Sequence, residues 1–156
     1  AIYAKQEFQS IDTFSYHNIP NIIGSLTIDD SPTDIHFIST LTRPPASYKD
    51  YTLLKKHLHK VSEQCNNINE PLLAFGDYNV VPWSNEIQEF RHKAHLLDSR
   101  RGFMPTYPNG ALHFFWAPLD HIFFSSHFKC LNFGTISGET SQHLGIQGVF
   151  QINEKQ

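Results

Sequence analysis

Residues 72–79 have the sequence LLAFGDYN, and this stretch decides both the fold and the candidate site. Four apolar residues in a row, Leu72 to Phe75, are typical of a strand that is covered on both faces. At its end Asp77 and Asn79 are two residues apart and point to the same side. A carboxylate such as Asp77 is suited to hold a water molecule, and an amide such as Asn79 is suited to donate a hydrogen bond to a phosphate oxygen. Taken alone, however, GDYN also suits a turn in which both side chains bind their own backbone.

A long amphipathic helix precedes this strand. Ser47, with Asp50 three residues later, resembles a capping box. Apolar residues then recur at spacings of three and four: Tyr51, Leu54, Leu58, Val61, Cys65 and Ile68. The polar residues off this face, among them His57, are interpreted as solvated rather than as a nucleic-acid patch.

The remaining elements predict an α+β fold with helices packed on a largely antiparallel sheet. Residues 22–28 and 34–41 are predicted to form a hairpin around a turn cluster, and a shorter helix is predicted from Ser84 to about His95. Five more strands are expected: Phe103 to Tyr107, Ala111 to Trp116, Asp120 to Ser125, Lys129 to Thr135 and Leu144 to Ile152.

Composition is that of one globular domain over residues 1–156, with 40% hydrophobic residues. The net charge of −3 argues against strong nonspecific binding to DNA. Cys65 and Cys130 make neither a zinc site nor a disulfide framework. No targeting segment and no apolar run of membrane-spanning length is present, which leaves the localisation open, as well as a membrane anchor in a longer parent.

Two later segments could complete a site with Asp77. Asp120 begins a very apolar strand, where a carboxylate needs a partner. An imidazole is a good partner, because the carboxylate fixes its tautomer and leaves the other ring nitrogen for a phosphate. His143, beside Ser141 in a Gly-rich loop, is the candidate. The alternative is that Asp120 only ends a turn. His121 points to the opposite face and is expected to be structural.

The order GDYN, LDHI and SQH resembles the signatures of the endonuclease/exonuclease/phosphatase family, which has the DNase I-like fold. Further stretches resemble an uncharacterised bacterial branch in which GDxN is followed by PWS: residues 43–45, 81–84, 98–103 and 105–108. The resemblance covers residues 20 to 152. It implies the C-terminal half of a four-layer α/β/β/α sandwich, as one mostly antiparallel sheet with an outer helix layer.

The resemblance also assigns roles, in an in-line phosphoester hydrolysis with Mg²⁺ or Mn²⁺. Asp77 would align or activate the attacking water, and Asn79 would orient the scissile phosphate. His143, with Asp120 as its partner, would stabilise charge on that phosphate. Besides Asn79, the residues expected at the substrate are Arg43 and Ser141. The expected metal ligand is Asp77, which binds weakly, with Gln142 as the candidate for a second ligand.

Two positions depart from the family pattern. An Asp usually stands where this chain has Gln142, and a neutral amide is a poor ligand for a hard cation. A His usually stands where this chain has Leu41. The family's N-terminal half, with its Asn and metal-binding Glu, is expected outside this chain, and the Gln6-Glu7 dipeptide is interpreted as a chance match.

Three functions therefore stay open. The chain is part of a phosphoesterase and is inactive alone, or it is a degenerate domain used for binding or assembly. In the third case it is an unrelated α+β binding module, which has no reason to gather these residues. We expect the inner sheet face to be buried by the missing N-terminal half, a second copy or another subunit. The substrate, whether nucleic acid, lipid or small phosphoester, is not determined.

Overall fold

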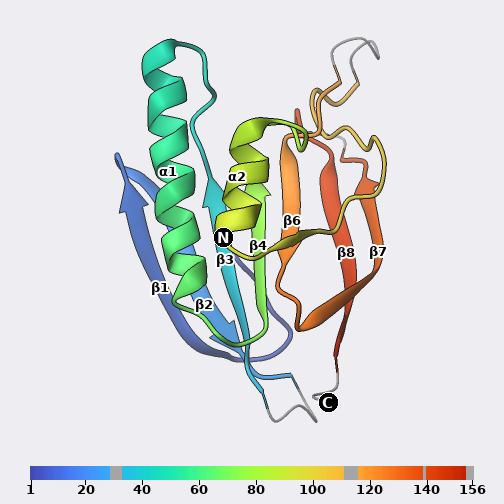
Figure 1. Ribbon diagram of the computed structural model, residues 1–156. Coiled ribbons are helices and arrows are strands. Elements are labelled where there is room, and N and C mark those ends of the chain that lie inside the picture. The colour runs from blue at the N-terminus through green and yellow to red at the C-terminus, as the bar shows by residue number, and fades with distance from the viewer. Residues whose placement is uncertain (29–32, 111–115, 139, 154–156) are drawn as a thin grey trace.

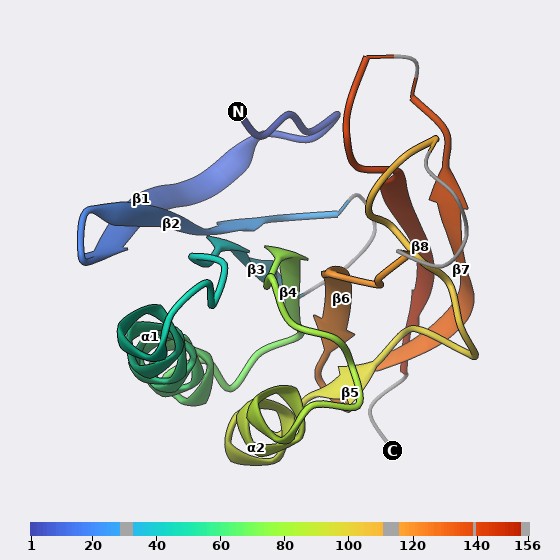
Figure 2. The same cartoon turned by 90° about the horizontal axis from the view of Figure 1, so that it is seen from above.

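The computed structural model describes residues 1–28, 33–110, 116–138 and 140–153. Helices cover one face of a six-stranded sheet, and a two-stranded sheet lies on the other face (Figures 1 and 2). The strands are β1 (Phe8–Tyr16), β2 (Ile19–Leu26), β3 (Ile35–Leu41), β4 (Leu72–Asp77), β5 (Leu97–Asp98), β6 (Asp120–Phe124), β7 (Phe128–Ile136) and β8 (Gly145–Ile152); the helices are α1 (Tyr48–Asn66) and α2 (Asn85–Lys93).

The large sheet has the strand order β1-β2-β3-β4-β6-β5, and only the β3–β4 pair within it is parallel. The predicted α+β class and the partial DNase I-like sandwich are therefore confirmed. The long helix is also confirmed, because Ser47 caps α1 by accepting from the Asp50 amide at 3.1 Å. Its apolar stripe packs against the centre of the sheet, where the fully buried residues include Ile38, Ala74 and Phe123.

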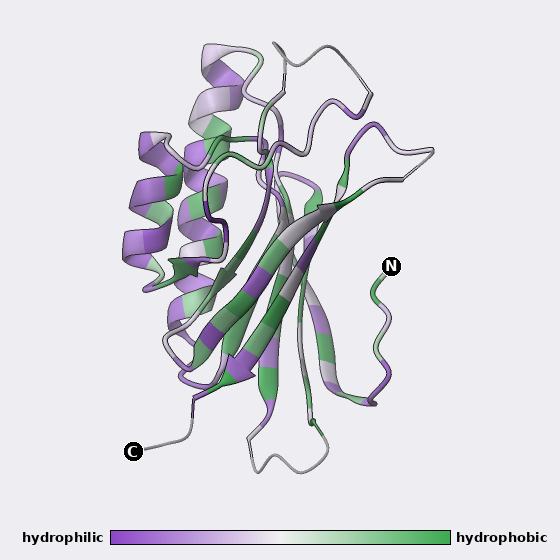
Figure 3. Cartoon of the chain, turned by 90° about the vertical axis from the view of Figure 1, so that its right-hand side faces the viewer, coloured by the Kyte–Doolittle hydropathy of each residue, from purple (hydrophilic) through white to green (hydrophobic). Residues whose placement is uncertain are grey.

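The C-terminal hairpin departs from the single sheet that the sequence suggested. Strands β7 and β8 pair only with each other. They pack face-on against the large sheet, with the Phe150 ring 5.4 Å from that of Phe124. Strand β6 pairs with β4 along its whole length, and β5 pairs with Phe123 and Phe124 at its other edge. Hydrophobic and hydrophilic residues alternate along the hairpin, as one-sided packing requires (Figure 3).

Strand β1 was not predicted, because its sequence FQSIDTFSY is largely polar. It pairs with β2 along its whole length and brings Tyr16 over α1. The Tyr16 ring stacks on His57 with centroids 5.1 Å apart. On the other side, His57 Nε2 lies 3.0 Å from the Asn21 amide oxygen. His57 is therefore 1% exposed, and the interpretation of this residue as solvated is wrong.

Two further predictions concern residues 103–116. Phe103 to Tyr107 is not a strand; it contributes one isolated bridge, between Tyr107 and Ala117. Gly102 has φ 75°, which turns the backbone out of an extended conformation there. The strand predicted for Ala111 to Trp116 falls almost wholly on residues 111–115, outside the described part. Among the described residues, no helix has the length and apolar character to cross a membrane.

The buried His57 predicts a dependence of stability on pH. Burial lowers its pKa from 6.5 to about 4 in the folded chain. The unfolded chain then binds more protons between these values, so stability is complete above pH 6.5 and falls as pH drops towards 4. At pH 5 this residue should account for a loss of about 2 kcal/mol.

Urea unfolding at pH 7 and pH 5 measures this loss. The His57→Gln variant should lose about 2 kcal/mol less than the native chain between the two values. The His59→Gln variant is the control, because His59 lies exposed on the same helix. Equal pH dependence of the native chain and His57→Gln would contradict the prediction.

Candidate active site

The candidate site lies where β3 and β4 end and β6 begins, at the same end of the sheet as the start of α1 (Figure 1). In the strand register Leu41 pairs with Asp77, and Asp77 pairs with Asp120. Directly paired residues project from the same sheet face, so these three side chains form a row. A pocket of about 690 Å³ opens there. Its lining comprises Ile19, Leu41, Thr42, Arg43, Pro44, Pro45, Asp77, Asn79, Tyr107, Leu119, Gln142 and His143.

Asp120 and His143 are hydrogen-bonded, with 2.8 Å between the carboxylate Oδ2 and the imidazole Nδ1. The geometry that the sequence predicted for this pair is therefore found. Because Nδ1 is engaged, Nε2 is the nitrogen available to a ligand. The Tyr107 ring lies 4.8 Å from the His143 ring, centroid to centroid, and helps to hold it.

Thr106 positions this pair; it lies in the stretch 105–108 that resembles the family, but no role was predicted for it. The side chain is fully buried, and its hydroxyl accepts from the backbone amides of Leu119 at 3.0 Å and Asp120 at 3.2 Å. The Thr106 carbonyl accepts from the Leu144 amide at 2.7 Å. One residue thus ties the start of β6 to the loop that carries His143, which fixes the two catalytic candidates relative to each other.

Asp77 and Asn79 form the turn predicted for GDYN and also line the pocket. The hydrogen bond of the turn is present, since the backbone N–H of Asn79 donates to Asp77 Oδ1 at 2.9 Å. The Asn79 side chain nevertheless reaches across to donate to the Thr42 carbonyl at 2.8 Å, at the wall of the pocket. Burial raises the pKa of Asp77, and the nearby Asp120 carboxylate raises it further. An added Cβ on Gly76 would lie 1.9 Å from the Thr40 carbonyl oxygen, so this position requires glycine.

Of the two further residues expected at the substrate, Arg43 lines the pocket and Ser141 does not. Arg43 lines the pocket and lies 3.6 Å from the Asp50 carboxylate. The Ser141 hydroxyl accepts from the His143 amide at 3.0 Å, so it supports the loop and is not among the lining residues. His121 is buried on the opposite face, with Nε2 2.8 Å from the Val80 carbonyl, in the structural role that the sequence predicted.

A metal ion would find a poor set of ligands here. One ligand atom each from Asp77, Asp120 and His143 lies within 4.8 Å of the others. However, the Asp120–His143 hydrogen bond already uses one atom of each. Asp77 is the remaining carboxylate, and Gln142 brings only an amide to the pocket. Hard divalent cations prefer several oxygen ligands, so these residues fit such an ion only in part.

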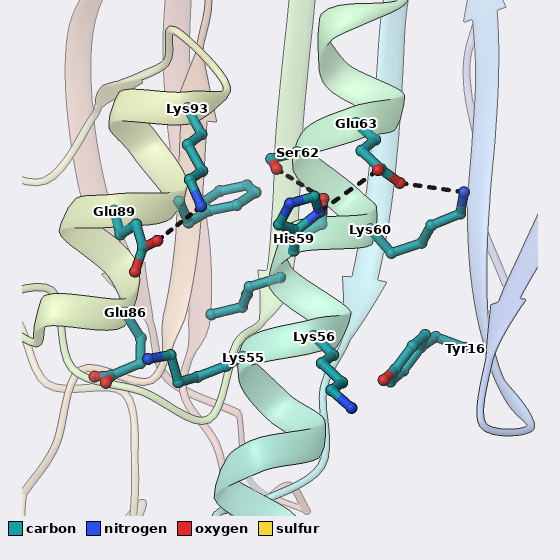
Figure 4. Close-up of a pocket in the computed structure, with 12 residues that line it drawn as sticks. Tyr16, Lys55, Lys56, His59, Lys60, Ser62, Glu63, Glu86, Glu89 and Lys93 are labelled. Atoms are coloured by element: carbon teal, nitrogen blue, oxygen red, sulfur yellow. Dashed lines mark hydrogen bonds and ion pairs between the residues drawn. The ribbon is translucent and has the colours of Figure 1, made fainter.

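A second pocket, of about 420 Å³, lies between α1, α2 and Tyr16 (Figure 4). Four of its charged residues form ion pairs: Lys93 with Glu89 at 2.7 Å, and Lys60 with Glu63 at 3.3 Å. Glu63 also lies 3.6 Å from the His59 imidazole, but this contact joins two exposed side chains one turn apart on α1 and is longer than the 2.8 Å hydrogen bond between Asp120 and His143. We therefore place the candidate chemistry in the first pocket.

An outer helix layer over a mostly antiparallel sheet, with a second sheet inside, is the architecture of the DNase I-like sandwich proteins. The sequence model of the endonuclease/exonuclease/phosphatase family matches residues 1–143, and the chain belongs to that family. The match begins well before residue 20, where the resemblance in sequence became visible. No curated protein matches the chain by sequence.

Solved structures agree on the fold. An endonuclease/exonuclease/phosphatase from Beutenbergia cavernae superposes with a TM-score of 0.79 at 17% identity, over 94% of this chain and 46% of that one. A mannosyl-6-phosphatase from Bacteroides thetaiotaomicron gives 0.70 at 18% identity, over 94% and 67%. The human Nocturnin catalytic domain, solved with bound sulfate, gives 0.70 at 14%, over 94% and 60%. The chain thus spans about half to two thirds of the length of these proteins.

Proposed function

We propose that this chain supplies half of the active site of a phosphoesterase that hydrolyses its substrate by in-line attack of water. The observation that carries the proposal is the 2.8 Å contact between Asp120 and His143 in the pocket that Asp77 and Asn79 also line. An unrelated binding module has no reason to bring together residues from such distant parts of the chain. Membership in the endonuclease/exonuclease/phosphatase family supports the same class of reaction.

Each residue has one task in this proposal. Asp77 orients the attacking water and accepts its proton, a task that a raised pKa favours. Asn79 is held by the Thr42 carbonyl and directs its amide group towards the scissile phosphate. His143 donates from Nε2 to a phosphate oxygen, while Asp120 holds the ring through Nδ1. Arg43, at the rim, attracts the negative charge of the substrate.

We propose Mg²⁺ or Mn²⁺ as the cofactor, held weakly by Asp77, with Gln142, which also lines the pocket, as an additional ligand. The ion would offset negative charge on the phosphate. The same ligand set supports a second candidate function. Leu41 and Gln142 both line the pocket, next to Asp77 and His143, where an apolar group and a neutral amide contribute nothing to cation binding. A degenerate, non-catalytic domain would retain the pocket without the ion.

The proposal includes a partner for the inner sheet face. The β7–β8 hairpin shares an apolar cluster with residues of β6 and with one end of β2, β3 and β4. Beyond it, Ile11 on β1 and Leu41 on β3 are 53% and 54% exposed. Ile11 pairs with Gly24 and Gly24 with Phe37, which places Ile11 on the same inner face. An N-terminal half, a second copy of the chain or another subunit would bury these residues.

Activity is expected only in a form of the protein that includes an N-terminal half. In that form, His143→Ala should lower the rate of hydrolysis of bis(p-nitrophenyl) phosphate about 100-fold or more, because charge on the phosphate loses its donor. His59→Gln, far from the pocket, is the control. Leu41→His combined with Gln142→Asp should raise the rate. An unchanged rate in His143→Ala would disprove the proposed role of His143. If the double variant hydrolyses the substrate no faster than the native form, the interpretation of the domain as degenerate is disproved.

Binding of a divalent ion to this chain should be weak. Titration calorimetry with Mg²⁺ and with Mn²⁺ should detect nothing tighter than about the millimolar range, because one free carboxylate is too small a ligand set. The Asp77→Asn variant should remove the remaining binding, whereas Glu63→Gln, on the exposed surface of α1, should not. A micromolar dissociation constant would show that the chain holds a complete metal site.

The open inner face predicts association. Light scattering on this chain should give a mass above that of the monomer, or the monomer should bind a hydrophobic dye, because exposed apolar surface favours both. The changes Ile11→Lys and Leu41→Lys should reduce both signals, and Tyr48→Lys, at the exposed start of α1 on the other side of the sheet, is the matched control. A monomer of native sequence that binds no dye would contradict this prediction.

A further inference from the structure

Two large aromatic side chains lie exposed beside each other near the candidate site. Trp83 is 62% exposed and Phe103 is 60% exposed, yet their ring centroids are only 6.2 Å apart. The planes of the two rings are inclined by 33°, and we call this exposed pair of rings the aromatic platform. Adjacent apolar side chains that stay in water are unfavourable and commonly mark a ligand surface.

Local contacts hold the platform in place before any ligand arrives. Trp83 precedes α2 in a turn where the Ser84 amide donates to the Val81 carbonyl at 3.0 Å. The Gln88 side chain donates to the Pro82 carbonyl at 2.6 Å, which secures the same turn. Phe103 stands between Gly102, whose positive φ sets the turn, and Met104, whose carbonyl accepts from Arg100. A surface fixed in this way binds with little loss of conformational freedom.

The platform is close to the catalytic pocket. Trp83 is four residues from Asn79, and Phe103 is four residues from Tyr107; Asn79 and Tyr107 both line the pocket. A chain segment of this length spans at most about 14 Å, so the Cα atoms of Trp83 and Phe103 each lie within that distance of the Cα atom of a lining residue. Trp83 is also two residues from the start of α2, a helix that packs on the outer face of the sheet.

We propose that the aromatic platform of Trp83 and Phe103 binds the nucleobase of a nucleotide phosphoester whose phosphate occupies the pocket at Asn79 and His143. This inference rests on the proposed function and specifies its substrate class. Two neighbouring aromatic rings match the flat π face that every base presents. The net charge of −3 argues against a long duplex, which favours a mononucleotide or the end of a single strand.

Direct binding to this chain tests the inference without requiring activity. Titration calorimetry compares AMP with ribose 5-phosphate, which carries the same phosphate and sugar without the base. The native chain should bind AMP about tenfold more tightly, as stacking of one base on an aromatic side chain implies. This ratio should fall to about one in Trp83→Ala and in Phe103→Ala, and Trp83→Phe should restore most of it. Tyr48→Ala, which removes another exposed aromatic ring, is the control and should leave the ratio unchanged.

The Asn79→Ala variant separates the two levels of the proposal, because it should weaken both ligands equally by removing a phosphate contact. Equal affinity of the native chain for AMP and ribose 5-phosphate would overturn the aromatic platform and leave the phosphoesterase proposal intact. Tighter binding of mannose 6-phosphate than of AMP would overturn the choice of a base in favour of a sugar. Binding of neither phosphate ligand would overturn both proposals.

Discussion

The hydrogen bond between Asp120 and His143 is the contact on which the candidate site depends, because it joins residues that belong to two different parts of the fold. Asp120 belongs to the six-stranded sheet, whereas His143 lies in the loop that leads into the last strand of the small sheet. Thr106 reinforces the junction through its hydroxyl and its carbonyl. The pocket therefore retains its shape only while the two sheets stay packed through Phe124, Phe128 and Phe150.

Packing and chemistry favour different conclusions about this pocket. The hydrogen bonds that orient Asn79, Asp120 and His143 have distances of 2.8 to 3.2 Å and are those of a well-formed site. The row of paired residues at the strand ends, however, begins with Leu41, which places an apolar side chain next to Asp77. Position 142 adds an amide and no charge. The site thus keeps the means to orient a phosphate and has little means to hold a cation, which is why phosphate binding and metal binding have to be measured separately.

Much of the fold could be predicted from periodicity and caps. The helix after Ser47, the strand before Asp77 and the strands at the C-terminus all have patterns that local physics explains. The failures at β1, at the β7–β8 hairpin and at His57 share one feature: each depends on pairing or packing between elements and not on the local residue pattern. Strand β1 is polar and is held by β2 along its length, while β7 and β8 pair with each other and pack face-on against the large sheet. His57 looks solvated on its helix and is buried only because β1 covers it.

For the site, the sequence by itself determined the residue types and their order: a carboxylate and an amide at a strand end, a carboxylate opening a later strand, and a histidine in the final loop. Only the tertiary structure decided that Asp77 and Asp120 stand side by side, because strand register is a property of the assembled sheet. It also decided that Ser141 supports the loop, that Thr106 holds the Asp–His pair, and that Trp83 meets Phe103. These contacts join segments whose separation in the chain carries no local signal, and packing alone brings them together.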